Sequence, residues 1–296
     1  MTISQMHTAF KLELDKIDSL QYPSFTTNEI DYWLNQAIRK FVKTRYSGVN
    51  PKGEGFEQTQ KRIDDLRTLV REVTVPCTTT GAIKSIGTTT VISYVLTSGF
   101  SNTVFTAAPY WLSLGEEVKL TLSNPTATIR TGVTEITSDD YSAEIDNPYS
   151  SYILHYRNAK PLRLFYNNTI EFISDGTYVV TEAYVRYVKQ PVAVNYTATI
   201  GVVSGNILPG YRYLAATAGS ITYNGVSYAV GTTFLGVEGV TTFTPVGGGT
   251  VNFVATDCEL PEHCHDEIVS LGVQMALENI EQPRYQSYSQ NITTME

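Results

Sequence analysis

Cysteine, tryptophan and histidine are scarce in this chain of 296 residues, which has three, two and four of them. An odd number of cysteines in so long a chain does not fit the even set of a disulfide-stapled secreted domain. No window approaches the ~18 consecutive apolar residues of a membrane span, and the opening MTISQMHTAFKLELDK mixes acidic and basic residues where a signal peptide needs an apolar run. We therefore expect a soluble, unsecreted protein made in a reducing compartment.

Basic side chains are also too few for a protein that grips phosphate. The chain has 21 Lys and Arg against 29 Asp and Glu, which gives a formal net charge of -8 and a pI near 5.1. Nucleic-acid binding needs clustered Lys and Arg, and an acidic surface repels DNA and RNA instead.

No set of residues in the sequence fits a catalytic site. The sequence has no G-x-S-x-G motif, and Gly247-Gly248-Gly249-Thr250 lacks the Lys and the helix of a phosphate-binding loop. Neighbouring acids usually face opposite ways on a strand, so the following pairs are interpreted as solvated turns: Glu116-Glu117, Asp139-Asp140 and Asp266-Glu267. The sequence predicts no enzyme and no cofactor.

One grouping, Cys258, His263, Cys264 and His265, has the elements of a metal site. Three of these residues are consecutive, and at the start of a helix they would point about 100° apart. We therefore predict no metal site, and interpret the group as exposed polar residues at a helix start together with a small buried thiol. Zinc analysis of the purified protein would test this.

Amphipathic helices are predicted in residues 1–73, where charged residues are frequent. Thr2 with Gln5, and Thr26 with Glu29, have the spacing of a capping box. Apolar residues then recur every three or four positions: Met6, Phe10, Leu14 and Ile17, and later Ile30, Trp33, Leu34, Ala37, Ile38, Phe41 and Val42. Pro23 ends the first helix, and Gly48, Asn50 and Pro51 end the second.

A third helix is predicted from about Glu57 to Val70, with Ile63 and Leu66 on its apolar line. A last helix is predicted near the other end, with Pro261 at its first position and Pro283 at its end. Its broad apolar surface contains Ile268, Leu271, Gly272, Met275, Ala276 and Leu277.

The middle of the chain predicts strands. Thr, Val, Ile and Tyr dominate from about residue 73 to 256, and turn-forming residues recur every ten positions or so, as in a sandwich or barrel. The clearest strands are Val118 to Leu122, Ile170 to Ile173 and Val179 to Val188. In the last of these, Ala183, Val185 and Tyr187 alternate with Glu182, Tyr184, Arg186 and Val188, which predicts one buried face and one face that meets water or a neighbour. Asn224-Gly225 between two β-prone runs predicts a type I′ hairpin, because both residues of that turn need positive φ.

These patterns predict an α+β fold: a helical bundle formed by the N- and C-terminal segments, with an inserted β-sandwich or barrel-like region and a further small β insert. Residues 194–256 contain only two charged side chains, which sets the small insert apart. The predicted domains are 1–73 with 257–282 (helical), 74–194 (β-rich), 195–256 (small β insert) and 283–296 (C-terminal arm).

Tyrosine is frequent, with twenty copies. Tyr suits protein interfaces, because its ring buries area while its hydroxyl remains satisfiable, but it also suits strand packing, and both interpretations remain open. A second function follows from the Tyr-rich, charge-poor insert: a carbohydrate- or receptor-binding β module on a helical anchor. Glycan binding lost on changing Tyr223 or Tyr228 would support that alternative.

Four runs that together cover about half the chain are SFTTNEIDYWLNQAIRKFVKTRY near the start, ITSDDYSAEIDNPYS and YVRYVKQP in the middle, and DCELPEHCHDEIVSLGVQMALENIEQPRYQSYSQ near the end. These runs resemble the head-to-tail connector (ring or adaptor) proteins of crAss-like bacteriophages. In the resemblance, Lys189-Gln190-Pro191 leads quickly to Asp257-Cys258, so residues 195–255 resemble an inserted decoration.

The resemblance implies a virion protein of the neck: a ring of twelve copies beneath the portal protein, joined to other neck and tail proteins, assembled in the host cytoplasm and passing DNA without binding it specifically. No membrane contact is expected. The arm after Pro283 is polar and aromatic without periodicity, so we expect it to become ordered on a neighbouring copy. The candidate interface residues are Arg284, Tyr285, Tyr288 and Ile292.

Overall fold

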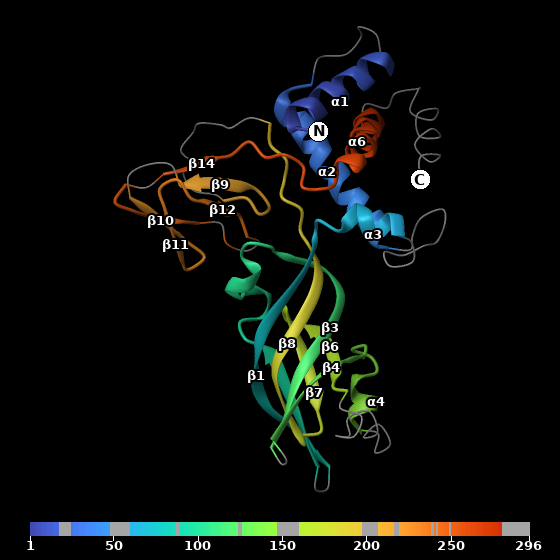
Figure 1. Cartoon of the computed structure of the whole chain (residues 1–296), viewed down its shortest axis with the longest axis vertical. Helices are drawn as coiled ribbons and strands as arrows, with labels where there is room; N and C mark the ends of the chain where they lie inside the picture. Colours follow the sequence, from blue (N-terminus) through green and yellow to red (C-terminus); the bar gives the residue numbers. More distant parts are fainter. Residues whose placement is uncertain are drawn as a thin grey trace. The chain divides into compact units, whose positions relative to one another are not determined.

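The computed structural model describes residues 1–17, 25–47, 60–86, 89–123, 126–146, 160–196, 207–215, 219–237, 240, 242–248 and 250–279. The chain divides into two compact units, Met1–Leu69 with Pro191–Glu296, and Val70–Gln190 (Figure 1). Both helices and strands are present, so the α+β class is confirmed.

Two capped helices open the chain, α1 (Ile3–Ile17) and α2 (Thr27–Tyr46). The Thr2 N–H donates to Gln5 Oε1 at 2.8 Å, and the Thr26 N–H donates to Glu29 Oε2 at 2.7 Å. In return the Thr2 hydroxyl accepts from the Gln5 N–H, and the Thr26 hydroxyl accepts from the Glu29 N–H. Both predicted capping boxes are therefore confirmed.

Helix α3 (Gln60–Leu66) is shorter than predicted. The prediction that it reaches Val70 is wrong, because Val70 begins strand β1 and pairs with Val188. Strand pairing at a β-branched residue outweighs the helical spacing of the apolar side chains here. The predicted start at Glu57 lies outside the described residues.

The closing helix α6 (His265–Asn279) follows a short 3₁₀ turn, η4 (Glu262–Cys264). The sequence predicted Pro261 at the first helical position, but it is the residue before the 3₁₀ turn, and α6 begins at His265. Helix α6 lies beside α1 and α2 (Figure 1). A Cβ added at Gly272 would lie 3.5 Å from Phe10 Cε2 and 3.6 Å from Leu34 Cδ2, which shows how closely the three helices approach.

An eight-stranded sheet forms the second unit, in the order β4-β3-β8-β1-β2-β7-β6-β5. All neighbours are antiparallel except β5 and β6. The strands are β1 (Val70–Ile86), β2 (Thr89–Leu96), β3 (Tyr110–Ser123), β4 (Thr126–Gly132), β5 (Thr134–Glu135), β6 (Leu162–Tyr166), β7 (Thr169–Ser174) and β8 (Tyr178–Lys189), with η2 (Gly99–Ser101), η3 (Thr103–Phe105) and α4 (Tyr141–Asp146) between them.

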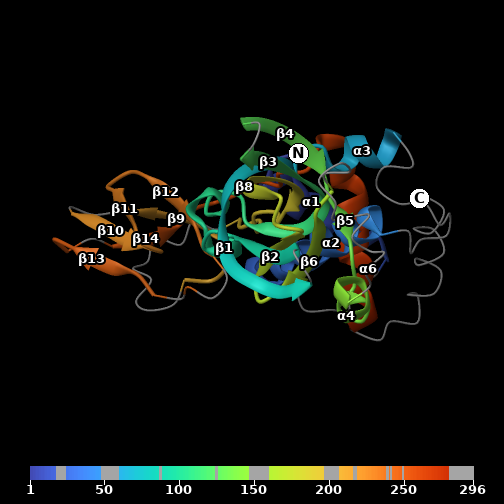
Figure 2. The ribbon, with the colours of Figure 1, turned by 90° about the horizontal axis from the view of Figure 1, so that it is seen from below.

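This sheet curls into a half-barrel, as the end-on view in Figure 2 shows, instead of forming the two facing layers of a sandwich. The long strands β1 and β3 both contain register shifts, and such irregularities bend a strand. The concave side therefore encloses its own core, which includes Val75, Tyr94, Phe105, Val118, Leu120, Phe172, Ala183, Val185 and Tyr187. The three strands predicted most clearly lie within β3, β7 and β8 and are confirmed.

Six short strands follow in two three-stranded sheets, β11-β10-β13 and β12-β9-β14. They are β9 (Arg212–Ala215), β10 (Ser220–Tyr223), β11 (Val226–Ala229), β12 (Thr233–Leu235), β13 (Thr244–Val246) and β14 (Val251–Phe253). Asn224 and Gly225 join β10 to β11 with φ of 48° and 74°, so the predicted hairpin with two positive φ values is confirmed.

The two ends of this small β region lie next to each other. Asn195 and Thr256 form an antiparallel bridge, in which the Asn195 N–H donates to Thr256 O at 3.2 Å and the Thr256 N–H donates to Asn195 O at 2.9 Å. The chain therefore enters the small β region and leaves it at adjacent positions. The division into four domains made from the sequence stays a prediction.

Candidate functional site

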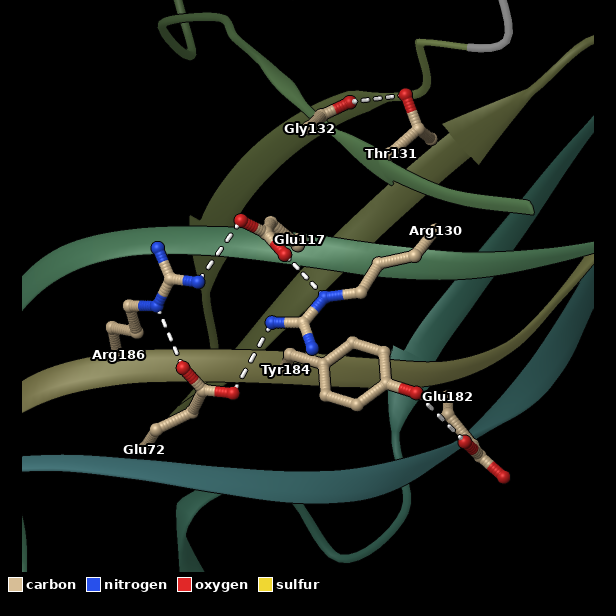
Figure 3. Close-up of polar contacts among 8 residues, drawn as sticks. All are labelled: Glu72, Glu117, Arg130, Thr131, Gly132, Glu182, Tyr184 and Arg186. Atoms are coloured by element: carbon tan, nitrogen blue, oxygen red, sulfur yellow. Dashed lines mark hydrogen bonds and ion pairs between the residues drawn. The ribbon is translucent and has the colours of Figure 1, made fainter.

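Four charged side chains form a closed loop of ion pairs on one face of strands β1, β8, β3 and β4, drawn in Figure 3. Arg186 Nε donates to Glu72 Oε2 at 2.7 Å, and its Nη2 donates to Glu117 Oε1 at 3.1 Å. Arg130 Nη2 donates to Glu72 Oε1 at 3.1 Å, and its Nε donates to Glu117. Each guanidinium therefore bridges both carboxylates; we call these four residues the carboxylate–guanidinium network.

The network favours the charged form of its members. The hydrogen bonds from Arg186, and then from Arg130, lower the pKa of the Glu72 carboxyl below its usual value. The pKa of Arg130 is raised chiefly by its hydrogen bond to Glu117, and that of Arg186 chiefly by its hydrogen bond to Glu72. All four side chains are partly exposed, so each pair contributes little stability alone, but together they connect four strands.

The same face continues along β8. The Arg130 guanidinium lies 3.8 Å from the centre of the Tyr184 ring, and the Tyr184 hydroxyl donates to Glu182 at 3.5 Å. Glu182 also pairs with Lys119 Nζ at 3.2 Å. The charged residues named here are three cations and three anions, so together they carry no net charge.

Sequence reasoning identified only part of this surface. The alternation in β8 predicts that Glu182, Tyr184, Arg186 and Val188 share a face that meets water or a neighbour. This is wrong for Val188, which is buried in the structure. The alternation gave no sign of Glu72 and Arg130, because their contact with β8 depends on the register of strands distant in sequence.

A second polar cluster lies within the first unit, where α3 meets η4. Asp65 Oδ1 is 2.9 Å from His263 Nε2 and 3.6 Å from Cys264 Sγ. Asp65 Oδ2 accepts a hydrogen bond from Arg45 Nε at 3.0 Å, and Arg45 Nη2 donates to Glu267 at 2.5 Å. We call Asp65, His263 and Cys264 the Asp–His–Cys cluster.

The sequence grouped Cys258, His263, Cys264 and His265, but the structure does not bring all four together. His263 and Cys264 converge on Asp65, whereas His265 points elsewhere and contacts the Met1 amino group at 2.9 Å and Leu260 O at 2.9 Å. The prediction of exposed polar residues is wrong for His265, which is 4 % exposed and whose pKa is lowered by burial. Asp65 was missed because it lies 198 residues from His263 in the sequence.

One buried acid–histidine pair has the elements of a catalytic dyad. His7 Nε2 lies 2.7 Å from Asp31 Oδ1, and its ring stacks on Tyr196. Among the described residues, His7 Nδ1 has no hydrogen-bond partner, so the pair is not linked to a nucleophile. The Tyr196 N–H also donates to Asp31, so the pair packs α1 and α2 against the segment that follows β8.

The candidate interface residues Arg284, Tyr285, Tyr288 and Ile292 lie outside the described residues. No helix in the described part of the chain has both the length and the apolar character needed to cross a membrane.

Comparison with known proteins places the chain among structural proteins of phage tails. Residues 1–205 match the crAss ring 3/4 family, described as phage tail ring protein 3/4, and the chain belongs to this family. The resemblance to ring proteins of crAss-like phages is thus confirmed. A search of the curated proteins found no match.

The matched residues include helices α1 to α3 and the whole eight-stranded sheet, with the carboxylate–guanidinium network. The match ends before β9. Strands β9 to β14, the η4 turn and helix α6 therefore lie beyond it, as does the closing run that resembles the family.

Proposed function

We propose that copies of this chain form a closed ring in the head-to-tail connector of a tailed phage, between the portal and the tail, around a passage for DNA. The observation that carries this proposal is the match of residues 1–205 to a family of tail ring proteins. Repeated head-to-tail contacts between identical copies close into a ring when the rotation per copy divides a full turn, and twelve copies is our expectation.

The two ends of the chain would supply the rigid frame of each subunit. Three contacts between distant parts of the sequence support this: the Ile3 N–H donates to Asp257 at 2.7 Å, Arg45 pairs with Glu267, and Gly272 packs near Phe10. We therefore propose that helices α1, α2, α3 and α6, from the two ends of the chain, form one helical bundle.

The charge distribution suits a passage that does not retain DNA. The net charge of -8 opposes binding of a polyanion. The guanidiniums of Arg130 and Arg186 are engaged by carboxylates, so a phosphate would have to displace these contacts. DNA is expected to pass such a ring without specific binding.

Imaging the purified full-length chain by negative-stain electron microscopy tests the proposal, with mass photometry to count copies. We expect closed rings, either from the chain alone or after addition of the portal protein of the same phage. A chain that stays monomeric at high concentration, with and without that portal protein, would contradict the proposed assembly.

The structure does not favour the alternative of a carbohydrate-binding insert. Tyr223 is 1 % exposed, and its hydroxyl donates to Val240 O and accepts from the Val237 N–H, both at 2.8 Å. Its ring belongs to the core of the small β region and is closed to a glycan. The Tyr228 ring packs against the same core.

A further inference from the structure

The Asp–His–Cys cluster brings a carboxylate, an imidazole and a thiol to one point. Their ligand atoms all lie within 4.8 Å of one another. Asp65 and Cys264 are 1 % and 2 % exposed, so two of the three groups are held inside the protein. Cys, His and Asp are the side chains that bind zinc and similar ions.

Two of the three distances among the ligand atoms are close to those that a tetrahedral metal ion requires, and the third, between His263 and Cys264, lies within the 4.8 Å that spans the cluster. With metal–oxygen and metal–nitrogen bonds of about 2.0 Å and a metal–sulfur bond of about 2.3 Å, the ligand atoms should be about 3.3 Å (N to O) and about 3.5 Å (S to O) apart. The observed 3.6 Å between Cys264 Sγ and Asp65 Oδ1 already fits. The 2.9 Å between His263 Nε2 and Asp65 Oδ1 must widen by about 0.4 Å, which the half-exposed His263 side chain can accommodate.

The surroundings orient and balance such an ion. Arg45 holds Asp65 Oδ2, leaving Oδ1 directed at His263 and Cys264. Hydrogen bonds of this kind to ligand carboxylates fix ligand geometry in metal sites. With Cys264 as thiolate, Asp65, Glu267 and Cys264 carry three negative charges against the one positive charge of Arg45, and a divalent cation neutralises the remainder.

We propose that the Asp–His–Cys cluster binds one divalent transition-metal ion of the zinc type, with a water molecule in the fourth position. The exposed side of His263 provides the entry path and room for that water. A thiolate ligand favours zinc or cobalt over magnesium or calcium, which prefer oxygen. The ion would connect α3 to η4 at the start of α6.

Binding must release one proton. Burial and the nearby Asp65 carboxylate raise the pKa of the Cys264 thiol, so the thiol is protonated before the ion enters and loses its proton to solvent when sulfur bonds to the metal. His263 Nε2 must offer its lone pair to the ion, so the ring hydrogen lies on Nδ1 when the ion is bound.

This proposal does not depend on ring assembly, because it concerns contacts within one chain. The test uses the full-length chain with any affinity tag removed and bound metal stripped by a chelator. Titration with Co²⁺ should give one ion per chain and a sulfur-to-cobalt charge-transfer absorption, which Zn²⁺ removes and Mg²⁺ does not.

Variants assign the ligands. Cys264→Ser should abolish the charge-transfer absorption, and His263→Ala should weaken Co²⁺ binding at least about tenfold. Cys258→Ser is the matched control, since Cys258 is a neighbouring thiol outside the cluster, and it should keep both the absorption and the affinity. If Cys264→Ser fails to fold, His263→Ala still tests the site, because the His263 side chain is half exposed and its removal should leave the fold intact.

The proposal is overturned if saturating Co²⁺ gives no charge-transfer absorption with the wild-type chain. It is equally overturned if His263→Ala binds Co²⁺ as tightly as wild type, or if Cys258→Ser loses the absorption. In each of these cases the three residues form only a hydrogen-bonded cluster.

Discussion

The Arg45–Asp65 pair is buried, and burial strongly affects how much stability is lost when one member of an ion pair is removed. Both side chains are almost fully buried, at 3 % and 2 % exposure, whereas Arg130 in the carboxylate–guanidinium network is 41 % exposed. Removing one member of a buried pair leaves the other without compensation, while an exposed pair loses little.

Arg45→Met should therefore reduce the free energy of unfolding by about 3–5 kcal/mol, measured by denaturant titration. Arg130→Met is the matched control, because it removes an exposed arginine of the same kind, and should cost no more than about 1 kcal/mol. Equal losses in the two variants would contradict the burial of Arg45.

Several tyrosines form core, as shown by Tyr178, Tyr187, Tyr213 and Tyr223, which are among the largest fully buried side chains. Of the two interpretations of the tyrosine content, strand packing holds for these four. Their hydroxyls keep partners: Tyr187 donates to Ala108 O at 2.6 Å, and Tyr213 accepts from the Leu208 N–H at 2.8 Å.

Alkaline pH should therefore unfold the sheet. Burial raises the pKa of Tyr187 to about 12, above the value of about 10 in an unfolded chain. Because the folded-state pKa is the higher one, the stabilisation is complete below pH 10 and is lost as pH rises towards 12. Denaturant midpoints measured across this window should fall less steeply for Tyr187→Phe than for wild type; identical slopes would contradict the prediction.

At the scale of elements, the packing of α6 depends on a residue without a side chain. Gly272 is helical, and a methyl group there would meet Phe10, Leu34 and Ala37 at ordinary van der Waals distances of 3.5–3.7 Å. Glycine inside a helix costs about 0.5–1 kcal/mol relative to alanine.

Gly272→Ala should accordingly stabilise the protein by up to about 1 kcal/mol, seen as a higher melting temperature. Gly272→Leu should destabilise it by about 1–3 kcal/mol, because the larger side chain overfills the same space. If both variants melt at the same temperature, the three helices do not pack at this position.

Elements with a local signal could be predicted from the sequence. Capping boxes such as Thr26 with Glu29, the Asn224-Gly225 turn and the alternating strand β8 all depend on residues a few positions apart. The curl of the sheet and the end of α3 at Leu66 could not be predicted, because strand pairing between distant segments determines them.

For the candidate sites, too, only the residues with a local signal could be predicted from the sequence. The sequence placed His263 and Cys264 in a grouping that has the elements of a metal site, although no metal site was predicted there, and it indicated the polar face of β8. It could not supply Asp65 from α3 or Glu72 from β1, since each reaches its partners only through tertiary contacts.

At the scale of the whole molecule, the Asn195–Thr256 bridge makes the small β region a closed excursion. Replacing residues 197–255 with a short glycine linker keeps this bridge and the contact of Tyr196 with Asp31. We expect the shortened chain to unfold cooperatively with its helical circular dichroism retained, and to form the same assemblies. Aggregation of the shortened chain, or loss of assembly, would show that this region is part of the subunit frame.

The C-terminal arm leads to a second prediction on assembly. Deleting residues 283–296 should weaken ring formation, because the arm would add contacts with a neighbouring copy. In mass photometry over a dilution series, rings of the truncated chain should dissociate at a higher protein concentration than rings of the wild-type chain. Unchanged dissociation would exclude the arm, with Arg284, Tyr285, Tyr288 and Ile292, from the contact.

Strand β4 ends the sheet, and among the described residues no strand pairs with its outer side. A free edge of this kind is a template on which strands of other molecules can add, the route by which sheets grow into aggregates. Arg130 lies on this strand, held by Glu72 and Glu117, and a fixed charge on an edge disfavours such addition. A subunit made in many copies could thus remain dispersed at high concentration until its proper partners arrive.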